Sequence, residues 1–177
     1  MTRKLVTAPL VMVAGIGLAL LGVTAYAAVS TVTAVGTMAE SDLFGGPASI
    51  TMRTLTIDSD EVLGWHYHPG VGAYTIVKTG TLTIEDGCGG EAVYSADQAF
   101  LEPPGRVHRG KSQGHTEVVT AQTFIVPLGA PISVSVPQLC GPPAEVADCR
   151  SGAWSDYTHP RLFRSQGDCE QYVITGK

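Results

Sequence analysis

Apolar and polar residues alternate through the middle of this chain in short runs that Gly, Pro or Asp residues separate. A period of two residues is typical of a β-strand with one buried face, and 50–57 is a clear example. No segment after the first 27 residues shows a sustained helical period. We therefore predict about nine strands, over residues 50–57, 64–68, 73–78, 81–85, 92–94, 99–102, 106–110, 117–127 and 132–136.

This spacing predicts an all-β fold, with one sandwich or closed barrel over residues 47–137. Residues 28–46 are small and polar and end at Gly45-Gly46-Pro47, so we expect a flexible lead-in there. In the C-terminal extension, 138–177, residues 144–177 are too few and too polar to hold a core without a disulfide. We expect a C-terminal extension stapled in that way.

The first 27 residues have the pattern of a signal peptide. Arg3 and Lys4 precede an uncharged apolar run, and Ala25-Tyr26-Ala27 is a typical signal peptidase site. We predict cleavage after Ala27 and a secreted or extracytoplasmic protein. An uncleaved membrane anchor is the alternative, and such a leader would be the protein's one attachment to a membrane.

Charge argues against a nucleic-acid partner. The chain has a net charge of -5, and cleavage would remove two basic residues, which leaves about -7. Arg106, Arg109 and Lys111 form the largest basic cluster, and they flank His108, where they could attract a small anionic ligand. The absence of asparagine, the few lysines and the many Ala, Gly and Val residues suggest a GC-rich, actinobacterium-like source.

The cysteines point to an oxidising compartment. All four lie after the leader, and an even count outside the cytoplasm favours two disulfides. None is part of a Cys-x-x-Cys pair, which argues against a zinc ribbon or a thioredoxin-like site. Spacing leaves all three pairings open among Cys88, Cys140, Cys149 and Cys169.

Three histidines carry the most specific chemistry. His66 and His68 are two residues apart on a predicted strand, so both imidazoles can face one point. The Pro103-x-Gly105 turn precedes His108 and can bring a later strand back across this pair. Three imidazoles at one point are the ligands of a divalent transition metal. Ligand type does not distinguish iron, zinc, manganese, nickel and copper.

These motifs and their spacing resemble those of the cupin superfamily over about residues 45–137. The positions that match its two motifs are His66, His68, Gly80, Pro103, Gly105 and His108. The resemblance implies a small jelly-roll β-barrel with a metal at its centre. It does not fix an activity, because the family includes dioxygenases, isomerases, decarboxylases, storage proteins and ligand sensors. Cupin barrels often pair through edge strands, so a homodimer is one assembly that the resemblance allows.

The chain departs from the family pattern at the metal-binding glutamate, which falls on Ala73. Some cupins related to thiol dioxygenases use three histidines alone, so a site of His66, His68 and His108 is still expected, with greater dependence on the groups around it. Tyr74, Glu102 and Glu117 are the nearest oxygen donors in sequence, and we expect all three on solvated surface, with Glu102 at a turn.

The remaining departures and histidines have smaller consequences. Two family glycines and a closing asparagine fall on Asp60, Asp97 and Ser112. His115 and His159 are expected on the surface.

The C-terminal segment resembles a cysteine-bounded motif of exported actinobacterial proteins. The shared residues are Cys149, Gly152, Trp154, Phe163, Gln166, Gly167, Cys169, Tyr172 and Val173. This resemblance implies a Cys149–Cys169 disulfide, which leaves Cys88 to pair with Cys140. The segment could be a recognition module or a stapled cap on the barrel.

Three functional hypotheses follow. The first is a small-molecule oxygenase with His66, His68 and His108 as metal ligands. The second is a non-catalytic ligand-binding or metal-binding module, and the third is an envelope interaction protein that uses the C-terminal cysteine motif. No Gly-x-Ser-x-Gly elbow or phosphate loop supports a hydrolase or kinase.

Overall fold

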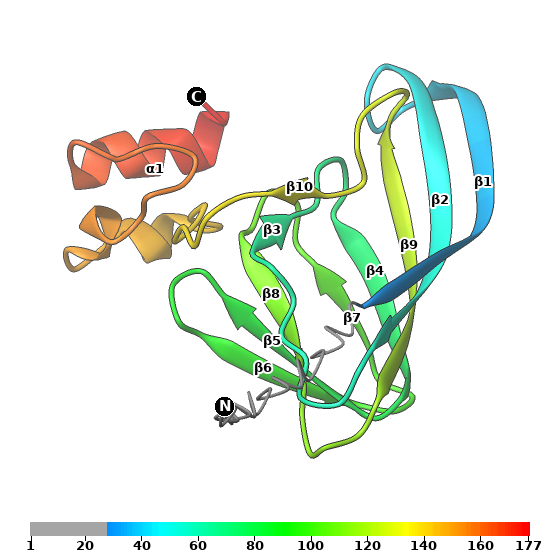
Figure 1. Cartoon of the computed structure of the whole chain (residues 1–177). Coiled ribbons are helices and arrows are strands. Elements are labelled where there is room, and N and C mark those ends of the chain that lie inside the picture. The colour runs from blue at the N-terminus through cyan, green and yellow to red at the C-terminus, as the bar shows by residue number, and fades with distance from the viewer. Residues whose placement is uncertain (1–27) are drawn as a thin grey trace, which may run out of the picture.

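The computed structural model describes residues 28–177, so the predicted leader and its cleavage site lie outside the described residues. Ten strands and a short helical segment make up this part of the chain (Figure 1). Within it, no helix combines the length and the apolar character that crossing a membrane requires. The strands are β1 (Val29–Ser41), β2 (Gly46–Ile57), β3 (His66–Tyr67), β4 (Ala73–Thr79), β5 (Thr81–Asp86), β6 (Glu91–Ser95), β7 (Ala99–Glu102), β8 (His108–Ser112), β9 (Val118–Pro127) and β10 (Val134–Ser135).

The strands form two five-stranded sheets that face each other. One sheet has the order β1-β2-β9-β4-β7 and the other β10-β3-β8-β5-β6, and all recorded pairings are antiparallel. Residues 118–126 of β9 alternate between buried and half-buried positions, as a strand with one face on a core requires. The predicted all-β fold, a single jelly-roll barrel with a stapled extension, is confirmed.

The apolar core fills the space between the sheets beside the three histidines. It is formed by Leu55, Ile57, Val77, Leu82 and Val118, with Leu63, Ile84, Tyr94 and Phe100 packed around them. These side chains come from strands of both sheets, so burying them holds the sheets face to face. The alternation of apolar and polar residues that predicted the strands therefore also places apolar side chains beside the site.

The prediction of a flexible lead-in over residues 28–46 is wrong for most of its length. Residues Val29–Ser41 form β1, which pairs antiparallel with β2 at the edge of its sheet. Val29, Val32 and Val35 remain exposed, so hydrogen bonds to β2 hold this strand rather than core packing. The sequence interpretation weighed the small polar residues and undervalued the β-branched ones.

The extension contains a helix that the sequence interpretation missed. Two 3-10 turns, η1 (Val146–Cys149) and η2 (Ala153–Ser155), precede α1 (Gln166–Thr175), whose N-cap Ser165 accepts a hydrogen bond from the Asp168 amide. The α1 sequence has little amphipathic character, since it contributes few residues to a very small core. Helical periodicity was therefore too weak to indicate it.

Two disulfides fix the extension, with the pairing that the C-terminal motif implied. Cys149–Cys169 joins η1 to α1, and both sulfurs lie in a small cluster with Phe163 and Trp154. Cys88–Cys140 ties the β5–β6 turn to the start of the extension, which lies beside the barrel near β10 in Figure 1. The extension is thus held both internally and to the barrel.

Two aspartates, at positions where the family that the sequence resembles has glycine, have positive φ angles. Asp60 and Asp97 have φ angles of 62° and 69°, in the left-handed region that glycine favours and that aspartate tolerates better than most residues. Ser112, at the family's asparagine position, accepts a hydrogen bond from the Asp60 amide and donates one to the carbonyl of Thr116. These departures therefore preserve the turns of the barrel.

Candidate metal centre

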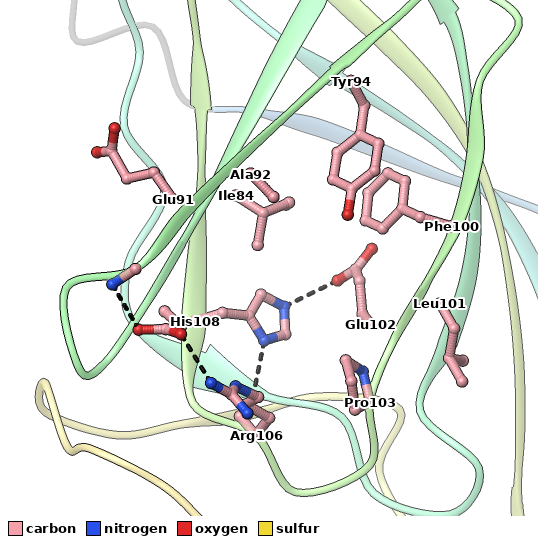
Figure 2. Close-up of a pocket in the computed structure, with 12 residues that line it drawn as sticks. Ile84, Glu91, Ala92, Tyr94, Phe100, Leu101, Glu102, Pro103, Arg106 and His108 are labelled. Carbon is pink, nitrogen blue, oxygen red and sulfur yellow. Dashed lines mark hydrogen bonds and ion pairs between the residues drawn. The ribbon is translucent and has the colours of Figure 1, made fainter. Parts of the chain in front are cut away.

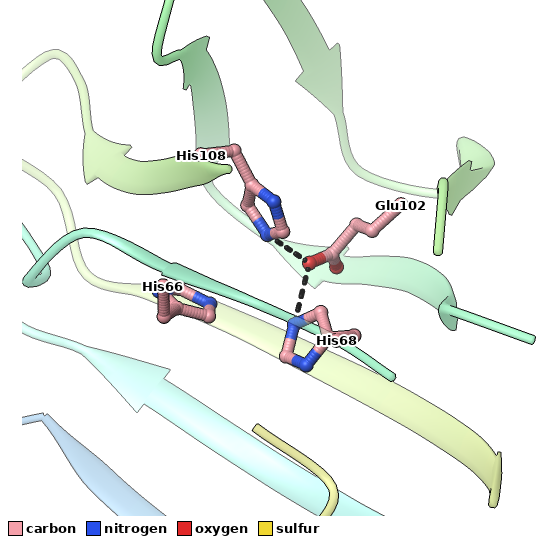
Figure 3. A group of neighbouring side chains, drawn as sticks. All are labelled: His66, His68, Glu102 and His108. Carbon is pink, nitrogen blue, oxygen red and sulfur yellow. Dashed lines mark hydrogen bonds and ion pairs between the residues drawn. The ribbon is translucent and has the colours of Figure 1, made fainter. Parts of the chain in front are cut away.

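Three histidines and one glutamate converge inside the barrel. One ligand atom each from His66, His68, Glu102 and His108 lies within 4.8 Å of the other three, and Figure 3 shows the four side chains turned toward one another. His66 on β3 and His108 on β8 are directly opposite in the strand register, while His68 follows β3 and Glu102 ends β7. The structure thus brings together the three predicted histidines and adds a carboxylate.

Main-chain carbonyl groups orient all three imidazole rings. The Nδ1 atoms of His66, His68 and His108 lie 2.8, 2.7 and 2.8 Å from the carbonyl oxygens of Gly64, Ile132 and Arg106. A carbonyl oxygen only accepts, so each Nδ1 must carry the proton and donate it. In a neutral imidazole Nε2 is then an unprotonated donor atom, which is the form that binds metals.

Glu102 is the main correction to the sequence interpretation, which placed it at a solvated turn. Its side chain is buried, and its Oε2 lies 3.0 Å from Nε2 of His68 and 2.8 Å from Nε2 of His108. Its Oε1 accepts hydrogen bonds from the Thr75 hydroxyl and, at 3.0 Å, from the Gln122 amide. Two neutral donors therefore satisfy one oxygen, and the other oxygen faces the imidazoles.

The strand register explains where the carboxylate comes from. Ala73 on β4 is the direct partner of Glu102 on β7, so both residues lie at the same level of the barrel. Ala73 stands at the position of the family's metal-binding glutamate and has no carboxylate. Glu102, on the neighbouring strand, supplies a carboxylate instead. Of the other two donors considered, Tyr74 is 54% exposed and Glu117 is also exposed. Both are surface residues, as predicted.

The charges at the centre are strongly coupled. Burial, and to a smaller extent the neighbouring His108, lower the pKa of His66 to about 4. Burial alone would raise the pKa of Glu102, but hydrogen bonds to His108 and His68 hold it well below its usual range. For His108, burial opposes the charged form, yet the bond to Glu102 raises its pKa overall. Without a metal, a proton is thus held between His108 and Glu102.

A pocket of about 330 Å³ leads to this centre (Figure 2). Its walls include Glu102 and His108 on one side and the stacked rings of Tyr94 and Phe100, whose centroids are 3.7 Å apart. Arg106 lies in the same pocket and pairs with Asp86 at 2.8 Å. The pocket is mainly apolar with a few convergent polar groups, as small-molecule sites usually are.

The remaining histidines lie away from the centre. His115 has a side chain that is 87% exposed and contacts Asp60. His159 is partly buried in the extension, where its ring packs against Tyr67 of β3. Neither belongs to the metal cluster of the described residues.

Comparisons with known proteins agree with the family resemblance. Residues 53–126 match the family described as Cupin domain. No curated protein matches the chain.

Several solved structures are similar to the described chain. A Klebsiella pneumoniae protein with a double-stranded β-helix domain is 14% identical, over 62% of this chain and 84% of that one, with a TM-score of 0.46. An oxalate oxidase in complex with the substrate analogue glycolate is 20% identical, over 49% and 46% of the two chains, with a TM-score of 0.42. A cupin superfamily protein from Desulfitobacterium hafniense is 13% identical, over 53% and 79%, with a TM-score of 0.39.

Proposed function

We propose, with the cupin-domain match over residues 53–126 as the premise, that this chain is an exported metalloprotein whose centre is formed by His66, His68, His108 and Glu102. The metal is a divalent transition ion, and the substrate is a small molecule that enters through the pocket beside Tyr94 and Phe100. The leading activity is an oxygenase-type oxidation.

The observation that carries this proposal is the arrangement of the protons. Three Nδ1–H groups are committed to carbonyl oxygens, so the Nε2 atoms of three imidazoles and a carboxylate oxygen are the atoms that face one point. Lone pairs at such distances repel one another unless protons or a cation lie between them. Imidazole and carboxylate ligands suit iron, zinc, manganese, nickel and copper, so the donor set fits the group without selecting one metal.

The protein's own groups define what the centre could do. Four protein ligands leave two positions of an octahedral shell for other molecules, and a bound redox-active ion would supply electron transfer to a substrate and oxygen there. Glu102 gives the centre one negative charge, and Thr75 and Gln122 hold its carboxylate in place. The apolar walls of the pocket limit access of water to the site.

The proposed location outside the cytoplasm has structural support in the cysteines. Every cysteine of the described residues is in a disulfide. Disulfides persist in oxidising compartments and are rare in the cytosol. This agrees with the signal peptide that the sequence predicts.

The proposal is tested by the metal content of the purified mature protein. We expect about one equivalent of transition metal in the wild type and a loss on the order of 100-fold in affinity in His66→Ala, because one of four ligands is removed. Elemental analysis after dialysis against a weak chelator measures both. His115→Ala is the matched control, since that histidine is exposed and outside the cluster.

Two outcomes would contradict this expectation. Sub-stoichiometric metal in the wild type would rule out a metal centre, and an equal loss in His66→Ala and His115→Ala would place the metal elsewhere. Oxygen uptake by the iron-loaded protein, measured with a panel of small organic acids, then separates an oxygenase from a binding module. Uptake that requires His66 supports the enzyme, and no uptake across the panel favours the module.

The stabilisation that Zn²⁺ provides is expected to increase as the pH rises from about 5 to 8. The pKa of His108 is raised in the folded metal-free protein, so its stabilising contribution is complete below the unfolded pKa and is lost as the pH rises through the folded pKa. Metal binding becomes more favourable over the same pH range, because the ion then displaces fewer protons from the imidazoles. Thermal melts with and without Zn²⁺ at each pH measure the difference in Tm.

The pH series has its own control and its own contrary result. The pKa of His115 is also raised, but the cause is a hydrogen bond to Asp60 on the surface, away from the metal centre. His115→Gln should therefore leave the Zn²⁺-dependent difference in Tm unchanged. A difference in Tm that is independent of pH would show that Zn²⁺ binds to groups other than these imidazoles.

A further inference from the structure

A row of polar side chains crosses the inner face of the β2-β9-β4 sheet next to the metal centre. Arg53, Gln122 and Thr75 occupy directly paired positions on β2, β9 and β4. Arg53 Nε donates to Gln122 Oε1 at 2.7 Å, and the Gln122 amide donates to Thr75 at 3.2 Å and to Glu102 at 3.0 Å. The row therefore connects a guanidinium to the carboxylate of the centre.

Arg53 is the charged residue of this row, and its charge has no direct partner. Across residues 28–177 it forms no ion pair with a carboxylate, and its one recorded hydrogen bond uses Nε. The four other N–H donors of the guanidinium have no acceptor there. Its guanidinium carbon lies 4.8 Å from the centre of the Phe124 ring, which provides a surface but no negative charge.

The basic cluster that flanks His108 is already neutralised. Arg106 pairs with Asp86, Arg109 pairs with Glu85 at 2.7 Å, and Lys111 pairs with both Glu85 and Glu91. The sequence suggested these three residues as the attraction for an anionic ligand. Of the two arginines in the described residues that line the spaces at the centre, Arg106 and Arg53, only Arg53 has no carboxylate partner, and it lies on the opposite sheet.

The charge balance changes when a metal is bound. Arg53 contributes one positive charge, and Glu102 contributes one negative charge. A divalent ion with three neutral imidazoles would leave the interior with a net charge of about +2. Uncompensated charge in a barrel interior is costly, so a metal-loaded centre has a strong requirement for an anion.

A small cavity lies between Arg53 and the candidate ligands of the metal centre. It has a volume of about 20 Å³, roughly that of one water molecule, and its lining includes Arg53, Gln122, His66, Glu102 and His108. Leu55, Ile57, Leu63, Leu82 and Ile84 make up most of its remaining wall. Ile84, Glu102 and His108 also line the 330 Å³ pocket, so the two spaces meet at the centre.

We propose that this centre accepts a small carboxylate ligand whose negative group lies between the metal and the Arg53 guanidinium. The inference rests on the proposed metal centre, because the ion would supply two of the positive charges that the ligand balances. The small cavity has room for one carboxylate oxygen, in the place of a water molecule, and the remainder of the ligand extends toward the larger pocket. Arg53 is thus a determinant of substrate charge, and the apolar lining selects against a second charged group near it.

The test compares acetate with its neutral counterpart acetamide as probes of the cobalt-loaded protein. Changes in the visible absorption of Co²⁺ report binding at the centre. We expect acetate to bind at least about tenfold more tightly than acetamide, and Arg53→Gln to weaken acetate binding by about 10- to 100-fold, because a charge-assisted hydrogen bond is lost. Arg53→Lys, which keeps the charge, should lose less.

Arg109→Gln is the matched control, since that arginine is paired with Glu85 and lines neither of the two spaces at the centre. Its acetate affinity should stay within about twofold of the wild type. Unchanged affinity in Arg53→Gln, a loss in Arg109→Gln instead, or equal binding of acetate and acetamide would each overturn the proposal. If Arg53→Gln does not fold, as thermal melts would show, Arg53→Lys decides: wild-type affinity or a partial loss supports a role of charge, and complete loss overturns it.

Cobalt content separates this proposal from the proposed function. A wild-type protein that holds one equivalent of cobalt but does not bind acetate would overturn the carboxylate site alone. A wild-type protein that does not retain cobalt would overturn the metal centre, and the carboxylate site with it.

Discussion

Glu102→Ala is expected to lower the metal affinity of the purified protein by at least about 100-fold. The substitution removes the one anionic ligand of the cluster, and it also leaves Thr75 and Gln122 without the oxygen to which they donate. The imidazoles would keep their orientation, because main-chain carbonyl groups fix them. Metal titration against a fluorescent chelator measures the change, and Glu117→Ala, at an exposed position, is the control.

The strand register makes a stronger form of this experiment available. Ala73 and Glu102 are direct partners on β4 and β7, so a glutamate at position 73 starts from the adjacent site on the same wall. In Glu102→Ala, the added substitution Ala73→Glu should recover part of the lost affinity. Ala73 is fully buried, so thermal melts must accompany the titration. Full metal affinity in Glu102→Ala itself would show that three histidines suffice and that the carboxylate is not a ligand.

Removal of the Cys149–Cys169 disulfide is expected to unfold the C-terminal extension while the barrel persists. A bridge across 20 residues contributes about 3 kcal/mol by restricting the unfolded chain. The cluster around it holds three buried residues, Cys149, Phe163 and Cys169, which is too small a core to replace that contribution. Limited proteolysis of Cys149→Ala/Cys169→Ala, followed by mass spectrometry, should find new cleavage sites confined to residues 141–177.

The second disulfide provides the comparison for this result. Cys88→Ala/Cys140→Ala removes the tie between the β5–β6 turn and the extension but leaves the Phe163 cluster intact. Metal content should be retained in the Cys149 and Cys169 variant, since none of the four ligands lies in the extension. Protease resistance equal to that of the wild type would show that packing against the barrel holds the extension without the bridge.

The strands and the three histidines could be predicted because the information for them is local. Alternation over a few residues places His66 and His68 on one face, and the turn before His108 limits where that residue can lie. The β1 strand was missed because it buries almost nothing, and α1 was missed because its core is a disulfide cluster rather than an apolar stripe. In both cases the stabilising contacts lie outside the segment itself.

Glu102 could not be assigned from the sequence for a different reason. Its role depends on the register between β4 and β7, which sets Ala73 opposite Glu102, and alternation within one strand carries no information about its neighbour. Spacing from the His-x-His pair pointed to Ala73 and therefore to a missing ligand. Phe100 and Glu102 both face inward on β7. This alternation is a local signal, and together with the pairing of β7 and β4 it could have indicated a buried carboxylate.

The origin of the carboxylate also changes how the two sheets are joined. Glu102 ends a four-residue strand at the edge of one sheet, whereas His66 and His108 belong to the other. An ion bound to all of them would be a cross-link between the two halves of the barrel, at the point where a short edge strand has a neighbour on one side only. In a chain whose extension already depends on disulfides, the metal would then be a third staple, and loss of the ion would release the strand that carries its only anionic ligand.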